Sequence, residues 1–280
     1  MTSSQDTGRE QTVRPAGKLP VFKTTFAACG FLFRNWRGFA MTALVPVLLS
    51  LALDLWSREW TETSNFANFV VSLVHLVPET LFSVAWYQFY LAGPARAVPA
   101  WFPSWTSRHW RFLGYALALN FLIFAMIDGP WWYWNDAIVF VIALATIVVM
   151  LYITMRFSLI FPAISIDQVY GLARSWRLTT GNGWRIFFAC WLIIIPVIIL
   201  VILIEFNTFL GMGIYFYSLF PSMGLGVGGI RFLWGLSLAK EFILVLVGYG
   251  VIGICVVVTS IAYQFCTALQ PPATGAGPEA

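Results

Sequence analysis

Residues 156–187 read RFSLIFPAISIDQVYGLARSWRLTTGNGWRIF, and this stretch joins two strongly apolar runs of the chain. Between the runs lies a short amphipathic segment, about Ile166 to Thr179, which Gly181 can end in the left-handed conformation. Its basic and aromatic side chains, with those that follow it, are Arg174, Arg177, Arg185, Trp176 and Trp184. We therefore predict two membrane spans joined by a basic hinge helix at the membrane surface. Asp167 is placed to begin this helix and to pair with Arg156.

The composition predicts a multi-pass membrane protein. Of the 280 residues, 60% are hydrophobic and only 10% are charged, whereas a soluble domain carries about 25% charged residues. A net charge of +4 could suggest nucleic-acid binding, but the positive charges are spread between apolar runs and form no basic globular domain. The four cysteines include no CxxC pair, so we expect neither disulfides nor a zinc site.

The apolar runs predict an all-α membrane domain over residues 19–268, because about twenty apolar residues suffice to cross a bilayer. Residues 19–36 form an amphipathic helix in the cytoplasmic interface, and the Gly-rich segment 211–240 could hold a short interfacial or re-entrant helix. Residues 1–18 and 269–280 are expected to be disordered cytoplasmic tails. The six predicted spans are 38–56, 66–91, 112–127, 137–161, 186–210 and 241–268.

Charge asymmetry predicts the orientation. If the amino terminus is cytoplasmic, thirteen of the sixteen lysines and arginines fall on the cytoplasmic side of the six spans. This distribution follows the positive-inside rule and puts both termini in the cytoplasm. The basic surface should also attract anionic lipid headgroups, at about 1 kcal/mol per residue.

A Trp-Arg pair precedes three of the predicted outward spans. The pairs are Trp36-Arg37, Trp110-Arg111 and Trp184-Arg185, spaced by 74 residues in both intervals. The spacing could reflect three repeats of an interfacial helix followed by two spans. It could equally reflect the preference of any outward helix for Trp and Arg at its cytoplasmic end.

Polar residues inside the predicted spans are the main candidates for a functional site. His75 and Glu79 are four residues apart near the middle of the second span, so they share one helix face. Intramembrane ionisable residues often mark ion or substrate pathways, which favours a proton or cation relay or a polar ligand contact. The alternative is structural: His75 and Glu79 satisfy each other, or Asn120, and hold helices together.

Sequence motifs for catalysis or cofactor binding lack the context they need. The GxGxxG pattern at 248–253 lies inside an apolar span without a preceding strand, so its small residues are better explained by close helix packing. No HExxH or GxSxG motif occurs. We predict no enzyme activity, no cofactor and no metal site.

An ordered set of residues runs through the hinge stretch: Arg156, Pro162, Asp167, Ser175, Trp176, Leu178, Thr179, Gly181 and Trp184. It resembles a pattern in a broad family of bacterial inner-membrane proteins, which includes the YciC-like proteins and the membrane domain fused to some glycerophosphodiester phosphodiesterases. The family acid is more often Glu than Asp, and the expected alanine falls on Leu172. The resemblance implies a six-helix domain in the bacterial inner membrane, accessory to lipid or envelope processes. No phosphodiesterase domain is present, so no catalysis carries over.

Three functions follow from this interpretation. The first is a non-catalytic protein that organises membrane lipids or a membrane protein complex, with anionic lipids, a membrane protein or a second copy of the chain as partners. The second is a transporter or channel for a small solute, a lipid or protons that uses Glu79 and His75. The third, an intramembrane lipid-modifying enzyme, has the least support from the residues.

Overall fold

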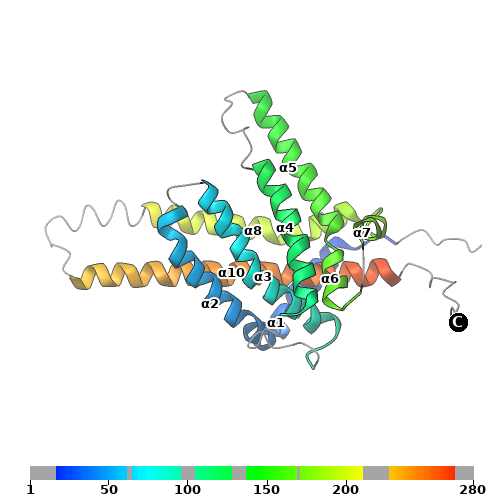
Figure 1. The fold of residues 1–280 in the computed structure, drawn as a ribbon, viewed down its shortest axis with the longest axis horizontal. Coiled ribbons are helices and arrows are strands. Elements are labelled where there is room, and N and C mark those ends of the chain that lie inside the picture. The colour runs from blue at the N-terminus through cyan, green and yellow to red at the C-terminus, as the bar shows by residue number, and fades with distance from the viewer. Residues whose placement is uncertain are drawn as a thin grey trace, which may run out of the picture.

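The computed structural model describes residues 17–61, 65–95, 105–127, 137–168, 171–210 and 227–268, and these residues form helices and short connections without any β-strand. The predicted tails, apart from residues 17 and 18, and most of the Gly-rich segment lie outside the described residues. Figure 1 shows the arrangement of the helices. In chain order they are α1 (Val21–Arg34), α2 (Trp36–Thr61), α3 (Asn65–Leu91), α4 (Ser107–Ile127), α5 (Ala137–Phe157), α6 (Ile160–Ser165), α7 (Leu172–Leu178), α8 (Gly183–Leu210) and α10 (Val227–Ala268).

Five stretches of the described helices are long and apolar enough to cross a membrane. They are Trp36–Ser57, Phe66–Leu91, Ala145–Ser165, Gly183–Ile204 and Leu238–Ala268. The predicted all-helical, multi-pass architecture is therefore confirmed in this coarser form. The predicted span 112–127 lies in α4, which is helical but is not one of the five, so the six-span topology stays a prediction.

The helices pack around α3 and the second half of α10. Phe82 and Trp86 of α3 are fully buried, and the Trp86 indole donates a hydrogen bond to the carbonyl of Gly253, at 3.0 Å. A side chain at Gly253 would meet Leu32 and Phe39 at 3.1 and 3.2 Å, so this glycine lets α10 approach α1 and α2 closely. The predicted role of small residues in helix packing is thus confirmed at Gly253. At Gly248 and Gly250 no atom lies within 4 Å of an added Cβ.

The hinge helix is shorter than the predicted range 166–179. The structure has α6 at the end of the Ala145–Ser165 stretch and then α7, and the backbone between them turns at Asp167, which has a φ of 60°. A non-glycine residue in this left-handed region cannot continue a helix, so α7 starts only at Leu172, after Gly171. Gly181 has a φ of 80°, so the predicted left-handed end after the hinge helix is confirmed.

The predicted pair of Arg156 and Asp167 is wrong. The Arg156 guanidinium instead donates to the carbonyl of Trp176 at 2.6 Å and to the Thr179 hydroxyl at 3.1 Å, and it lies 4.0 Å from the centre of a Trp176 ring. A cation is favoured there because the carbonyls at the end of α7 are unpaired within the helix. Asp167 pairs with Arg108 at 2.7 Å, since the turn aims its carboxylate toward α4.

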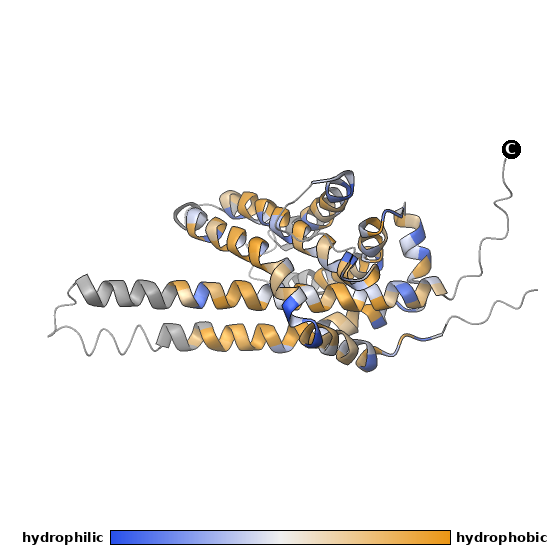
Figure 2. Cartoon of the chain, turned by 90° about the horizontal axis from the view of Figure 1, so that it is seen from below, coloured by the Kyte–Doolittle hydropathy of each residue, from blue (hydrophilic) through white to orange (hydrophobic). Residues whose placement is uncertain are grey.

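One end of the molecule gathers most of the described basic residues. The Arg108–Asp167 pair brings α4 to the hinge, Arg156 joins α5 to α7, and an Arg185 hydrogen bond to the Leu19 carbonyl joins α8 to the residues before α1. We call this end of the molecule, where Arg108, Arg156 and Arg185 lie, the basic end. In Figure 2 hydrophilic residues gather toward the right of the view, while the parts of α8 and α10 that run to the left are mostly hydrophobic.

Candidate functional site

A polar cavity lies between α2, α3, α4 and α10, within the membrane-spanning part of the molecule. It has a volume of about 410 Å³. Its polar and ionisable lining residues are Ser50, Asp54, Ser72, His75, Glu79, Asn120 and Tyr249. Leu76, Val245, Gly248 and Ile252 complete the wall. Such a concave site with a few convergent polar groups is typical of small-molecule binding.

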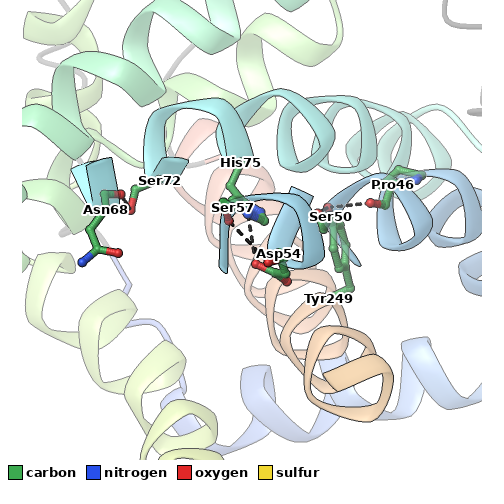
Figure 3. A network of polar contacts seen from close by, with 8 residues as sticks. All are labelled: Pro46, Ser50, Asp54, Ser57, Asn68, Ser72, His75 and Tyr249. Carbon is green, nitrogen blue, oxygen red and sulfur yellow. Dashed lines mark hydrogen bonds and ion pairs between the residues drawn. The ribbon is translucent and has the colours of Figure 1, made fainter. Parts of the chain in front are cut away.

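Helical spacing explains how these residues meet. On α2, Ser50 and Asp54 are four apart, and on α3, Ser72, His75 and Glu79 follow at spacings of three and four. Each set forms one stripe along its helix. The polar stripes of α2 and α3 face each other across the cavity, where α10 adds Tyr249 (Figure 3).

An ion pair joins α2 to α3. Nε2 of His75 lies 3.1 Å from Oδ1 of Asp54, which allows an ion pair when the imidazole is protonated. The His75 side chain is 18% exposed and that of Asp54 is 39% exposed, so the pair is open to the cavity. Figure 3 shows both side chains pointing toward each other.

Glu79 lies one helical turn beyond His75, toward the basic end. Its carboxylate has neither a hydrogen bond nor an ion pair with another described residue, although it lines the cavity. A carboxylate without a fixed partner in this apolar region needs a proton, a cation or water to compensate its charge. Glu79 is therefore an acidic side chain of the cavity that is available to a ligand.

Tyr249 closes the cavity on the side of the basic end. Its hydroxyl lies 2.8 Å from that of Ser50 and donates to the carbonyl of Pro46 at 3.3 Å (Figure 3). Behind it, the Phe82 ring packs edge-on at 5.2 Å, and Phe39 and Trp86 continue the aromatic layer. The aromatic layer separates the polar cavity from the basic end.

A second cavity of about 510 Å³ extends the polar space in the opposite direction. The two cavities share Asp54, Ser72, His75 and Val245. Ser57, Asn68 and Glu241 also line the second cavity, near the end of α2 and the start of α3. The polar space therefore runs from Glu79 toward the end of the molecule that lies away from the basic end.

The sequence prediction found part of this site. His75, Glu79 and Asn120 do line one cavity, but His75 pairs with Asp54 and not with Glu79. Asp54 lies inside both the predicted span 38–56 and the Trp36–Ser57 stretch, but it was not predicted as a site residue. The four-residue spacing of Ser50 and Asp54 in that stretch is the signal that could have identified it.

Among the described residues, no group of three His, Cys, Asp or Glu side chains is placed to hold a metal ion. The polar side chains of the cavity can instead surround a small polar molecule, and its apolar residues can contact an alkyl group.

The predicted interfacial residues lie at the basic end and not in the cavity. Each Trp-Arg pair stands in the first turns of a long helix: α2, α4 or α8. The Trp36, Trp110 and Trp184 side chains are exposed. Arg37, Arg111, Arg174, Arg177 and Arg185 lie in or beside the same helix ends.

The motif residues form a structural joint at the basic end. The Ser175 hydroxyl donates to the carbonyl of Arg156 at 2.9 Å, while the Arg156 side chain holds the end of α7. Trp184 stacks on Tyr152 with ring centres 4.2 Å apart, and Pro162 is buried in α6. The motif therefore fixes the connection between α5 and α8 and contributes no side chain to the cavity.

His109, also at this end, is positioned by local contacts. Its Nδ1 lies 2.9 Å from the Thr106 hydroxyl, and its ring stacks on Trp105. Burial, and secondly the nearby Arg108 charge, lower the pKa of His109 below its usual range. His109 is therefore held in its neutral form near neutral pH.

The fold and the cavity define a multi-pass helical membrane protein with a polar site inside its membrane-spanning region. No family model, curated protein or solved structure matches the chain. The resemblance of the hinge to the YciC-like family therefore remains a prediction.

Proposed function

We propose that the chain is a membrane transporter or channel for a small polar solute or protons, and that the polar cavity is its binding site. The observation that carries this proposal is the position of Asp54, His75 and Glu79 around one cavity inside the spanning region. Ionisable residues are costly there and mostly mark ion or substrate pathways. The proposal involves no catalytic step.

The shape of the polar space supports transport. It extends through the second cavity at one end, and Tyr249 and the Phe82 ring close it at the other. A binding site that is open to one side and closed to the other is what alternating access requires of one transport state. The Tyr249 hydrogen bonds to α2 would then break when the site opens toward the basic end.

Two neighbouring glycines provide a matched test in reconstituted liposomes. Gly248 lines the cavity, while Gly250 does not, and an added Cβ meets no atom at either position. Gly248→Leu should fill part of the cavity and reduce solute or proton flux at least about tenfold, because it removes the space without changing a charge. Gly250→Leu should leave the flux unchanged. Equal flux in both variants would count against the proposal.

Glu79→Gln tests the same site through its charge. We expect it to abolish flux that depends on a proton or a cation, because the amide cannot bind or release a proton. Asp167→Asn makes the same chemical change outside the cavity and serves as its control. Flux that is indifferent to Glu79→Gln would argue that this carboxylate plays no part in transport.

A second candidate function is the organisation of anionic lipids or of a membrane complex. It is supported by the basic end, where exposed aromatic rings such as Trp36 and Phe26 accompany the arginines. Replacing Arg174, Arg177 and Arg185 together should then reduce the anionic lipid that co-purifies with the protein. Unchanged lipid content would speak against this function.

The same distribution of charge supports an orientation with both termini in the cytoplasm, and the resemblance of the hinge stretch implies that the membrane is the bacterial inner membrane. Ten of the eleven lysines and arginines with described side chains belong to the predicted cytoplasmic side, and Lys240 is the exception. Reporter fusions to either terminus should therefore report the cytoplasmic side. The three-repeat interpretation of the Trp-Arg pairs also remains a proposal.

A further inference from the structure

We infer that the cavity binds a small organic cation and releases a proton from Glu79 as the cation binds. This inference rests on the proposed transport function, because it names the substrate class and the coupling of the same site. Three properties of the cavity support it: the balance of charge, the volume, and a lining of both polar and apolar residues.

The balance of charge favours a cation. Among the described residues that line the first cavity, the carboxylates are Asp54 and Glu79, and there is neither lysine nor arginine. A protonated His75 neutralises Asp54, with which it is already in ion-pair contact. One negative charge then remains, on Glu79, and a bound monovalent cation would compensate it.

The other groups that face Glu79 do not supply this compensation. From α2 the cavity receives Ser50, from α4 Asn120 and from α10 Tyr249, all of which are uncharged near neutral pH. Glu241 of α10 lines the second cavity, and its ion pair with Lys240 at 4.0 Å balances its charge. The charge that remains in the two cavities is therefore the negative charge of Glu79, which attracts cations and repels anions.

Size and lining favour an organic cation. A volume of about 410 Å³ falls in the range of small-molecule sites and far exceeds a bare ion. Leu76, Val245 and Ile252 present apolar surface that can contact alkyl groups.

Electroneutrality then couples binding to a proton. In the empty site, a proton on Glu79 and the Asp54–His75 pair leave no net charge. When an ammonium group enters, the O–H bond of the Glu79 carboxyl breaks, the proton passes to water in the second cavity, and the carboxylate pairs with the ammonium. The site gains one positive charge and loses one, so its net charge is unchanged. The Asp54–His75 pair keeps its proton throughout.

The test uses tetramethylammonium, which carries no titratable proton, so any released proton comes from the protein. The full chain in lipid nanodiscs is titrated with the probe near neutral pH in weak buffer with a pH indicator, and calorimetry measures binding. We expect one proton to be released for each probe bound. Glu79→Gln should release none and should bind at least about tenfold more weakly. Asp167→Asn should behave as wild type, and Glu79→Asp, which keeps the carboxylate, should still release a proton.

The outcomes separate this inference from the proposed function. Binding without proton release overturns the exchange with Glu79. If the wild type does not bind tetramethylammonium, the inference that the substrate is an organic cation is overturned. The transport function still stands if the wild type passes a neutral solute and Gly248→Leu does not. Wild-type liposomes that pass neither protons, cations nor neutral solutes contradict the proposed function itself. Because a wild-type titration without proton release already overturns the exchange, the inference stays testable even if Glu79→Gln does not fold.

Discussion

Asp54 and His75 stabilise each other inside a region that disfavours either charge alone. Removing one partner leaves the other uncompensated, whereas removing both leaves only an apolar contact between α2 and α3. Because the pair is partly open to the cavity, we expect Asp54→Leu or His75→Leu to lower the free energy of unfolding by about 1–3 kcal/mol.

The double variant Asp54→Leu/His75→Leu should be destabilised by less than the sum of the two single variants. Thermal unfolding in one detergent, compared across the four proteins, measures this coupling. Strictly additive effects would show that the two side chains do not interact in the folded protein.

The residue-scale prediction from sequence was partial for a physical reason. His75 and Glu79 stand out because they lie on one helix, where spacing alone predicts a shared face. Asp54 and Tyr249 reach the same cavity from other helices, and only the packing of α2, α3 and α10 brings them together.

At the scale of elements, hydrogen bonds join the residues just before α1 to the residues at the start of α8. The Leu19 amide donates to the Asn182 side chain at 2.9 Å, and the Asn182 amide donates to the carbonyl of Gly17 at 3.3 Å. Arg185 donates to the carbonyl of Leu19 at 2.9 Å, and Leu19 is fully buried. The start of α1 is therefore held by Asn182 and Arg185, which follow the hinge.

Asn182→Ala removes two of these hydrogen bonds, at about 1 kcal/mol each. We expect faster amide exchange at Leu19 and in the first turn of α1, while the exchange of α3 stays unchanged. Asn35→Ala is the matched control, because the Asn35 side chain donates to the Phe31 carbonyl within α1 itself. Equal rates of amide exchange in α1 of the two variants would show that Asn182 does not hold α1 against α8.

The sequence predicted the hinge as an element and missed its internal geometry. Periodicity and Gly181 indicated a short helix and its end. At the left-handed turn, the backbone amides of Asp167 and Gln168 donate to carbonyls at the end of α6, and the turn directs the Asp167 carboxylate toward Arg108 of α4. The predicted Arg156–Asp167 pair was wrong because the contacts of both side chains depend on how the helices pack.

At the scale of the whole molecule, charge and polarity divide the structure into three levels. The basic end lies on one side, the aromatic layer of Phe39, Phe82 and Trp86 comes next, and the polar cavity lies beyond it. The multi-pass helical architecture was predictable, since hydrophobic length dictates it. The cavity was not, because a hollow depends on which helices pack together.

The central claim is that the cavity is a water-filled site reached from the end away from the basic end. Ser72 lines both cavities, whereas Val70, two residues earlier on α3, is exposed and lines neither. The most direct measurement is the labelling of Ser72→Cys and Val70→Cys by a charged, membrane-impermeant thiol reagent, without the four native cysteines. Labelling applied to the side opposite the basic end should be at least about tenfold faster for Ser72→Cys, because only there can water ionise the thiol. Equal rates, or labelling of neither residue, would contradict the account.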